Sequence, residues 1–165
     1  MKALAVGILA ASLSVSAFAD VAYSSFGPSD SFNVGSGWTI GYITNQRIAL
    51  QFTSSTTGVL NTVEYASSAF IAGDINVLLY EDNNDTIGSQ LIAWGVSAVP
   101  SNSAITTLTN QFPSVSLTSG ADYWLELRPV SPSVALAWNF NNQGISALGF
   151  FADDNNSGSY AQFTG

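Results

Sequence analysis

The sequence predicts an all-β protein: a single jelly-roll-like β-sandwich that follows a cleaved signal peptide. Three observations point to this fold class. Apolar side chains recur at every second position in short runs rich in β-branched and aromatic residues, which is the pattern of half-buried strands. Clusters of Gly, Asn, Ser and Pro separate these runs, as turns do. No segment after the signal peptide carries the apolar stripe and caps of a helix, so a sandwich or barrel of many short strands is expected.

Residues 1–19 are organised as a secretory signal peptide. They begin with a positive charge, residues 3–15 are almost entirely apolar, and Ala17-Phe18-Ala19 forms a small-residue cleavage site before Asp20. The apolar run is shorter than the roughly 20 residues that cross a bilayer, which argues against a membrane anchor. We therefore expect residues 20–165 to be secreted, to the cell surface or the extracellular space, with no membrane span in the mature chain.

Four runs predict strands whose apolar side faces the core. In chain order, the residues expected to point inward are Ile48, Leu50 and Phe52; Ile75, Val77 and Leu79; Tyr123, Leu125 and Leu127; and Val134, Leu136 and Trp138. Turn clusters flank these runs at residues 35–37, 54–58, 72–74, 81–88, 100–103, 119–120, 131–133, 141–144 and 153–158. This number of turns indicates roughly eight to ten strands. Because there is no internal repeat or linker, residues 20–165 are expected to form one domain.

Charge and residue types exclude several function classes. Without the signal peptide, which carries Lys2, the chain has two arginines against eleven acidic residues, a formal net charge of −9, and it has no His or Cys. Nucleic acid and anionic membrane surfaces are bound mainly through Lys and Arg, so a nucleic-acid partner is excluded. Without disulfides, stability must come from the core or from bound ions. Most hydrolytic and redox mechanisms use His, Cys or Lys, which disfavours an enzyme.

Several short motifs occur in an order found in a known family of exported proteins. They are Phe26-Gly27-Pro28, Gly37-Trp38, Ala49-Leu50-Gln51-Phe52-Thr53, Val77-Leu78-Leu79-Tyr80-Glu81-Asp82 followed by Gly88, Leu117-Thr118-Ser119-Gly120-Ala121-Asp122-Tyr123-Trp124-Leu125, and Trp138-Asn139. In this order and spacing, nearly the whole of residues 20–165 resembles the bacterial choice-of-anchor R domain. The resemblance implies an exported jelly-roll-like sandwich of unassigned activity, usually delivered to the cell surface by a short PEP-CTERM-type sorting tail.

The sequence departs from the family pattern at two places. Ile87 stands where the family commonly has Pro before Gly88, which concerns a detail of one turn. Up to Gly165 there is no Pro-Glu-Pro segment, terminal apolar span or basic cluster, so membrane anchoring is not carried over. A domain truncated at its C terminus and a family member that is released are the two alternatives.

An acidic turn is predicted after the run that ends near Tyr80. Glu81-Asp82-Asn83-Asn84-Asp85-Thr86 places three carboxylates and two amides close together, and hard cations such as calcium prefer clustered oxygen ligands. One hypothesis is calcium at this turn, with Asp82 and Asp85 as side-chain ligands joined by Asn83 or a backbone carbonyl. Since the spacing is not that of an EF-hand, the sequence favours the alternative, a solvated turn built from good turn formers.

Trp124 is the side chain that most favours a binding role. If the apolar residues of the run 123–127 point inward, strand alternation places Trp124, Glu126 and Arg128 on the opposite face. A Trp flanked by a carboxylate and a guanidinium predicts a carbohydrate-binding site, with the ring against the apolar face of a sugar. The sequence favours the alternative, in which Trp124 packs under a loop or a neighbouring strand while Glu126 and Arg128 form a surface pair that stabilises little.

Catalysis would have to rest on carboxylates, because two Asp or Glu residues suffice for glycoside hydrolysis. The candidates are Glu64, Asp74, Asp122 and Glu126. Their spacing fixes no pair at the required separation. The sequence also contains no nucleophile elbow, phosphate-binding Gly loop or cofactor fingerprint.

Three function classes follow from these observations. The sequence favours a non-catalytic exported β-sandwich that serves as a surface, matrix or adhesion component, with extracellular polysaccharide or other surface proteins as partners. A carbohydrate-binding module is the alternative. A carboxylate-only polysaccharide-degrading enzyme is the least favoured class, and calcium is the only cofactor that the sequence suggests.

Overall fold

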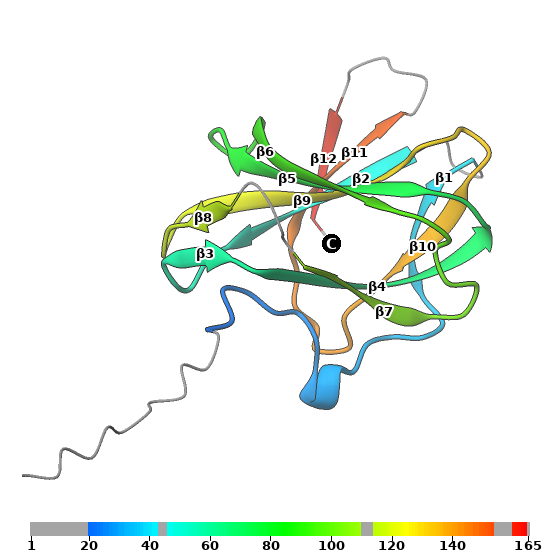
Figure 1. Cartoon of the computed structure of the whole chain (residues 1–165), viewed down its shortest axis with the longest axis horizontal. Coiled ribbons are helices and arrows are strands. Elements are labelled where there is room, and N and C mark those ends of the chain that lie inside the picture. The colour runs from blue at the N-terminus through cyan, green and yellow to red at the C-terminus, as the bar shows by residue number, and fades with distance from the viewer. Residues whose placement is uncertain (1–19, 43–45, 110–113, 154–159, 165) are drawn as a thin grey trace, which may run out of the picture.

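A computed structural model of the chain describes residues 20–42, 46–109, 114–153 and 160–164 (Figure 1). These residues form twelve β-strands, one 3₁₀ helix and no α-helix, which confirms the all-β class. The elements in chain order are η1 (Pro28–Asp30), β1 (Gly37–Gly41), β2 (Gln46–Thr53), β3 (Gly58–Leu60), β4 (Thr62–Ile71), β5 (Ile75–Asp82), β6 (Ile87–Val96), β7 (Ala104–Thr109), β8 (Val115–Leu117), β9 (Asp122–Pro129), β10 (Ala135–Asn139), β11 (Leu148–Asp153) and β12 (Tyr160–Thr164). The predicted signal peptide lies outside the described residues.

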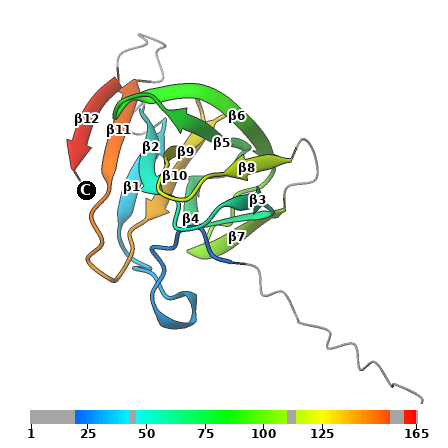
Figure 2. The same cartoon turned by 90° about the vertical axis from the view of Figure 1, so that its left-hand side faces the viewer.

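The strands form a curled antiparallel sheet that folds into two facing layers (Figures 1 and 2). Its order is β6-β5-β9-β2-β1-β10-β4-β7, and β11 and β12 extend it from β2. β1 pairs with β10 over its whole length but with β2 only between Gly41 and Gln46, so this pair is the corner where one layer passes into the other. β3 and β8 form a separate two-stranded sheet. The predicted jelly-roll-like sandwich is therefore confirmed at the level of architecture.

The core between the layers contains the residues that the period-two pattern predicts. Ile40 and Leu136 from one layer belong to the same buried cluster as Ile48, Val77 and Leu127 from the other. None of the twelve residues predicted to point inward is exposed. No helix in the described ranges is long and apolar enough to cross a bilayer.

The sequence pattern misses the longest strand of the second layer, β4. Its inward positions include Ser67, which is completely buried, and Ala69. Because small or hydroxylated residues replace large apolar ones there, the apolar alternation is interrupted and the run does not read as a strand. β3 and β8 have only three residues each, too few to show a period. The predicted count of eight to ten strands is too low for these reasons.

Candidate functional site

Strand β9 presents two different faces, as the alternation predicts. On its inner face Tyr123 and Leu125 pack with Leu79 of the adjacent strand β5. On its outer face Trp124 packs with Ala49 of β2, on the other side of β9. The residues that the sequence offers as a binding site, Trp124, Glu126 and Arg128, therefore lie on the outer face.

The ring of Trp124 is not available for stacking, because the residue is completely buried. It shares a buried cluster with Ala49, Leu78 and Tyr80, and Ile87 and Leu148 pack against this cluster. Its indole Nε1 donates a 2.7 Å hydrogen bond to Oδ1 of Asp82, so the polar edge of the ring is also engaged. The hypothesis of an exposed sugar platform at Trp124 is therefore corrected, and the favoured alternative of a packed Trp124 holds: neighbouring strands and the β5–β6 turn cover the ring.

Glu126 is also completely buried, at the centre of what we call the outer-face polar cluster: Arg47, Tyr80, Glu126 and Arg128. Arg128 donates from Nε to Oε1 at 2.9 Å and from Nη2 to Oε2 at 2.8 Å. The hydroxyl of Tyr80 donates to Oε2 at 2.8 Å, and Nε of Arg47 lies 3.6 Å from Oε1. The expectation of a weak surface pair is therefore wrong: Glu126 is buried and forms a bidentate ion pair with Arg128.

The outer-face polar cluster uses both arginines of residues 20–165. A buried carboxylate held by two guanidinium groups and a hydroxyl is compensated in charge and in hydrogen bonds. Removing one partner of such a group leaves an uncompensated buried charge, which costs about 3–5 kcal/mol. Glu126 and Arg128 thus have a structural role, and their polar atoms are directed at one another.

The acidic turn is a tight hairpin whose carboxylates accept hydrogen bonds from this same chain. Asn84 and Asp85 have φ of 54° and 58°, the left-handed conformation that a two-residue hairpin turn requires and that Asn and Asp tolerate. Asp82 accepts from Nε2 of Gln51 at 2.9 Å and from Trp124, and its second oxygen accepts from the backbone N–H of Asp85 at 3.1 Å. Gln51 also donates to Oδ1 of Asp85 at 3.2 Å.

These hydrogen bonds bear on the predicted calcium ligands Asp82, Asn83 and Asp85. Within the described residues no group of three or more His, Cys, Asp or Glu side chains is arranged to hold a metal ion. A cation on Asp82 would compete with the Trp124 and Gln51 donors. Calcium binding therefore stays a prediction, and the turn has a second explanation: Asp82 closes the outer face over Trp124.

The four carboxylates considered for catalysis lie on three parts of the fold. Asp122 and Glu126 are four residues apart on one face of β9, so their Cα atoms are about 13 Å apart. Glu64 is exposed on β4 in the other layer, and Asp74 is exposed in the turn between β4 and β5. Paired glycosidase carboxylates are about 5–9.5 Å apart, and the strand spacing of Asp122 and Glu126 exceeds this.

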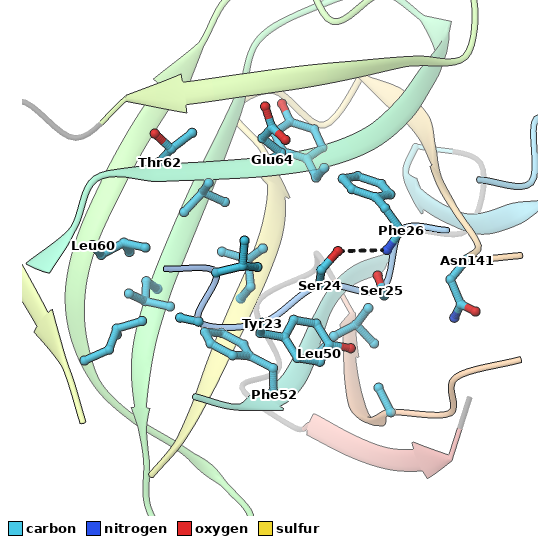
Figure 3. A pocket seen from close by; sticks show the side chains of 18 of the residues that line it. Tyr23, Ser24, Ser25, Phe26, Leu50, Phe52, Leu60, Thr62, Glu64 and Asn141 are labelled. Carbon is cyan, nitrogen blue, oxygen red and sulfur yellow. Dashed lines mark hydrogen bonds between the residues drawn. The ribbon is translucent and has the colours of Figure 1, made fainter. Parts of the chain in front are cut away.

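The structure contains a feature that the sequence did not predict, a cavity of about 530 Å³ between the two layers (Figure 3). It lies toward the end of β2 remote from the corner at Gln46, where Leu50, Phe52 and Leu125 line it. These three residues are only half-buried, because the facing layer does not fill the space opposite them. The volume falls within the range of about 300–1,000 Å³ that is typical of small-molecule sites.

Residues 20–26, here called the N-terminal strap, line this cavity. Figure 3 shows the strap lying between β4 and β2. Near its start the carbonyl of Ala22 accepts a 2.7 Å hydrogen bond from the backbone N–H of Ser55. The ring of Tyr23 packs against Phe52 with a centroid distance of 5.3 Å. The strap therefore forms part of the wall without belonging to any strand.

Exposed apolar side chains gather around the cavity. Val21 is 67% exposed, Tyr23 41%, Val59 54% and Ile145 40%, and all four line it. They come from the strap, β3 and the loop between β10 and β11, segments distant in sequence. Convergence of exposed apolar residues on one opening marks a ligand or partner site rather than scattered surface residues.

Two tyrosines of the cavity wall keep their protons well above neutral pH. Burial raises the pKa of Tyr23 above its ordinary value of 10.0, and a hydrogen bond with Ser25 opposes this in part. Burial likewise raises the pKa of Tyr65 above 10.0. Both rings therefore offer the cavity neutral aromatic surface.

The charged residues that line the cavity are all acidic. Asp20, Asp30 and Glu64 contribute to its wall, each is exposed, and none of the described lining residues is basic. Sequence reasoning missed this site because alternation shows which way a side chain points, not how completely the facing layer fills the space. The one available signal is the apolar and aromatic composition of the N-terminal strap, which belongs to no strand pattern.

Comparison with known proteins adds no relative: no family model, curated protein or solved structure matches the chain. The resemblance to the choice-of-anchor R domain accordingly stays a prediction.

Proposed function

We propose that this chain is a non-catalytic, exported β-sandwich of the cell surface or extracellular matrix that works by binding, and that the cavity between its layers is the binding site. Export rests on the signal-peptide pattern of residues 1–19. The observation that carries the binding proposal is the apolar cavity of about 530 Å³ with exposed apolar residues around it.

Two properties of the cavity support an apolar small-molecule ligand. Its inner wall comes from side chains that would otherwise complete the core, including Leu50, Leu79 and Leu125. The aromatic ring of Tyr23 in the strap packs against the ring of Phe52 in β2, and both rings add apolar contact area to the cavity wall. Binding sites of this kind are mostly apolar, with a few polar groups that orient the ligand.

The arrangement of the acidic residues supports a non-catalytic role. Glu126 is held in the outer-face polar cluster, and Asp122 accepts a hydrogen bond from Thr53. Glu64 accepts one from Thr107 at 2.8 Å. No two of the four candidate carboxylates face one another across the cavity, since only Glu64 lines it. The proposed partners remain extracellular: small apolar molecules here, and polysaccharide or surface proteins at other surfaces.

Titration with N-phenyl-1-naphthylamine, a neutral dye whose fluorescence rises in apolar surroundings, tests the proposal. We expect saturable binding by the secreted protein, with one dye per chain. Leu50→Trp, which adds volume inside the cavity, should weaken binding by about tenfold or more, equivalent to about 1.4 kcal/mol. The control Phe70→Trp changes an exposed residue away from the cavity and should bind as wild type. No saturable binding, or equal loss in both variants, would refute the proposal.

Carbohydrate binding is a second candidate, favoured by the partly exposed ring of Tyr23 beside Phe52. An aromatic face at an opening can lie against the apolar face of a sugar. Retention on a panel of immobilised glycans tests it. Tyr23→Ala should abolish retention while Trp124→Phe keeps it, because the Trp124 ring is buried. A wild-type protein that no glycan retains would remove this candidate.

A further inference from the structure

We propose that the natural ligand of the cavity is an amphipathic molecule with an apolar body and a cationic head group. This inference rests on the proposed function and specifies the ligand of the same site. It follows from the sign and position of the charges in the cavity wall.

The cavity offers an anionic head group no counter-ion. Its charged lining residues are Asp20, Asp30 and Glu64. The only basic side chains of residues 20–165 are Arg47 and Arg128, and both engage Glu126 on the outer face of the β9 layer. A fatty-acid carboxylate or a sulfate would therefore meet like charges, which disfavours binding, whereas an ammonium group meets opposite charges.

Cleavage of the signal peptide before Asp20 would add one positive charge at the cavity, the new α-amino group. Its ordinary pKa is about 7.7–8.0, so it is mostly charged at neutral pH. The carboxylate of Asp20, on the same residue, offsets this charge. Asp30 and Glu64 then still leave the opening net negative.

The acidic residues lie where they would contact the charged head group of an amphipathic ligand whose apolar body enters the cavity. Asp30 and Glu64 are exposed, so a head group beside them keeps most of its water. Leu79 is completely buried and Leu125 half-buried, so the inner wall suits a part of the ligand without charge. Burying an unpaired charge at that depth is strongly unfavourable, so the head should remain at the opening while the body enters.

Aromatic rings at the strap favour the same sign of charge. Tyr23 and Phe26 both line the cavity, and Tyr23 is 41% exposed. The face of an aromatic ring attracts a cation and repels an anion. The Tyr23 hydroxyl is protonated at neutral pH, because its pKa lies above the ordinary value of 10.0, so its ring adds no negative charge of its own.

Displacement of bound N-phenyl-1-naphthylamine by three molecules with the same ten-carbon chain tests the head group. The competitors are decyltrimethylammonium, decanol and decyl sulfate, all below the concentrations at which they form micelles. At low salt we expect decyltrimethylammonium to displace the dye at a concentration about tenfold or more below that of decyl sulfate, with decanol between them. High salt should reduce this difference, because exposed charges are screened.

Two double variants distinguish an effect of the charges in the cavity wall from an effect of the net charge of the whole protein. Asp30→Asn combined with Glu64→Gln should reduce the preference for the ammonium head at least threefold, the preference being the ratio of the concentrations of decyl sulfate and decyltrimethylammonium that displace the dye from the same variant. The control combines Asp74→Asn, in the turn after the far end of β4, with Glu81→Gln; it removes the same charge from residues outside the cavity and should keep most of the preference. Melting curves of both double variants verify that they are folded.

The outcomes distinguish this inference from the proposed function. If the dye does not bind at all, the proposed function fails and this inference fails with it. If the dye binds but the three head groups displace it equally, or decyl sulfate is preferred, only the cationic ligand is refuted. Equal loss of preference in the cavity and control variants would assign the effect to net charge and also refute it.

Discussion

The two faces of strand β9 differ in how completely their neighbours use them. On the outer face, Trp124 and Glu126 are completely buried, and their polar atoms are paired with Asp82, Tyr80 and Arg128. On the inner face, where a sandwich normally places its core, Leu125 is only half-buried beside a cavity. The face whose composition suggested a binding site is therefore structural, and the face whose composition suggested a core contains the candidate site.

This difference shows that, when a sheet is covered on both sides, the polar or apolar character of a side chain does not determine whether it is exposed. The β5–β6 turn, through Asp82, and residues such as Ile87 and Leu148 close the outer face of the β9 layer. The second layer faces the inner side but leaves space near Leu50 and Phe52, where the N-terminal strap lines the gap. The outer face is thus expected to be fully packed, whereas the inner face can accept larger side chains.

The largest effect is expected from Trp124→Ala. It removes a completely buried ring and leaves Asp82 without one of its donors, so unfolding in urea should show a loss of about 3–5 kcal/mol. Dye binding at low denaturant should persist in the folded fraction, because the ring does not line the cavity. A loss below about 1 kcal/mol would mean that the outer face is not packed as described.

Glu126→Gln should destabilise the protein by a similar or slightly smaller amount. The substitution keeps the shape but removes the negative charge between Arg47 and Arg128, and breaking a buried ion pair costs about 3–5 kcal/mol. The matched control is Glu64→Gln, an exposed carboxylate, for which we expect a change within about 0.5 kcal/mol. Equal effects at the two positions would contradict the difference in burial.

Replacing leucine by the larger phenylalanine should change the stability differently on the outer and inner faces of the β9 layer. Leu78→Phe on the outer face enlarges a residue that is 4% exposed in a filled cluster, and overpacking there should cost about 1–3 kcal/mol. Leu125→Phe on the inner face can extend into the cavity, so its effect on stability should be smaller than about 1 kcal/mol or favourable. The comparison fails if both variants are destabilised alike in the same denaturation experiment.

Alkaline pH should weaken the folded state through the buried wall of the cavity. Because burial raises the pKa of Tyr65 in the folded protein above 10.0, the unfolded chain loses this proton first as the pH rises. Its contribution to stability is full below pH 10.0 and falls above it, until the folded-state pKa is passed. Melting temperatures measured from about pH 8 to about pH 11.5 should fall less steeply for Tyr65→Phe than for wild type. The control Tyr42→Phe removes an exposed tyrosine; an equal change in slope there would assign the effect to something other than burial.

Calcium should give the smallest change. Full occupancy at about a hundred times the dissociation constant would add about 2.7 kcal/mol. Since Asp82 already accepts three hydrogen bonds, we expect a smaller stabilisation, and Asp85→Asn should remove it. Melting curves measured with calcium and with a chelator test this. Coincident curves would refute calcium binding, and the acidic turn would then have only the structural role of covering Trp124 through Asp82.

Period-two alternation in the sequence was enough to determine the all-β class and the orientation of the main strands. The runs around Ile48, Val77, Tyr123 and Leu136 all place their apolar sides inward, because a pleated strand sends successive side chains to opposite faces. The same rule put Trp124 and Glu126 together on the outer face. These are local properties, and a local rule can predict them.

What covers each face was decided only by the tertiary structure. Asp82 meets Trp124 across 42 positions of sequence and Tyr80 meets Glu126 across 46, through pairing of β5 with β9 that no local pattern specifies. The cavity likewise depends on how far two layers stand apart where the N-terminal strap lies between β4 and β2. The burial of a side chain and the presence of a cavity depend on many residues that are distant in sequence. Alternation therefore predicted the directions of the side chains but not which face of the sheet would be completely packed.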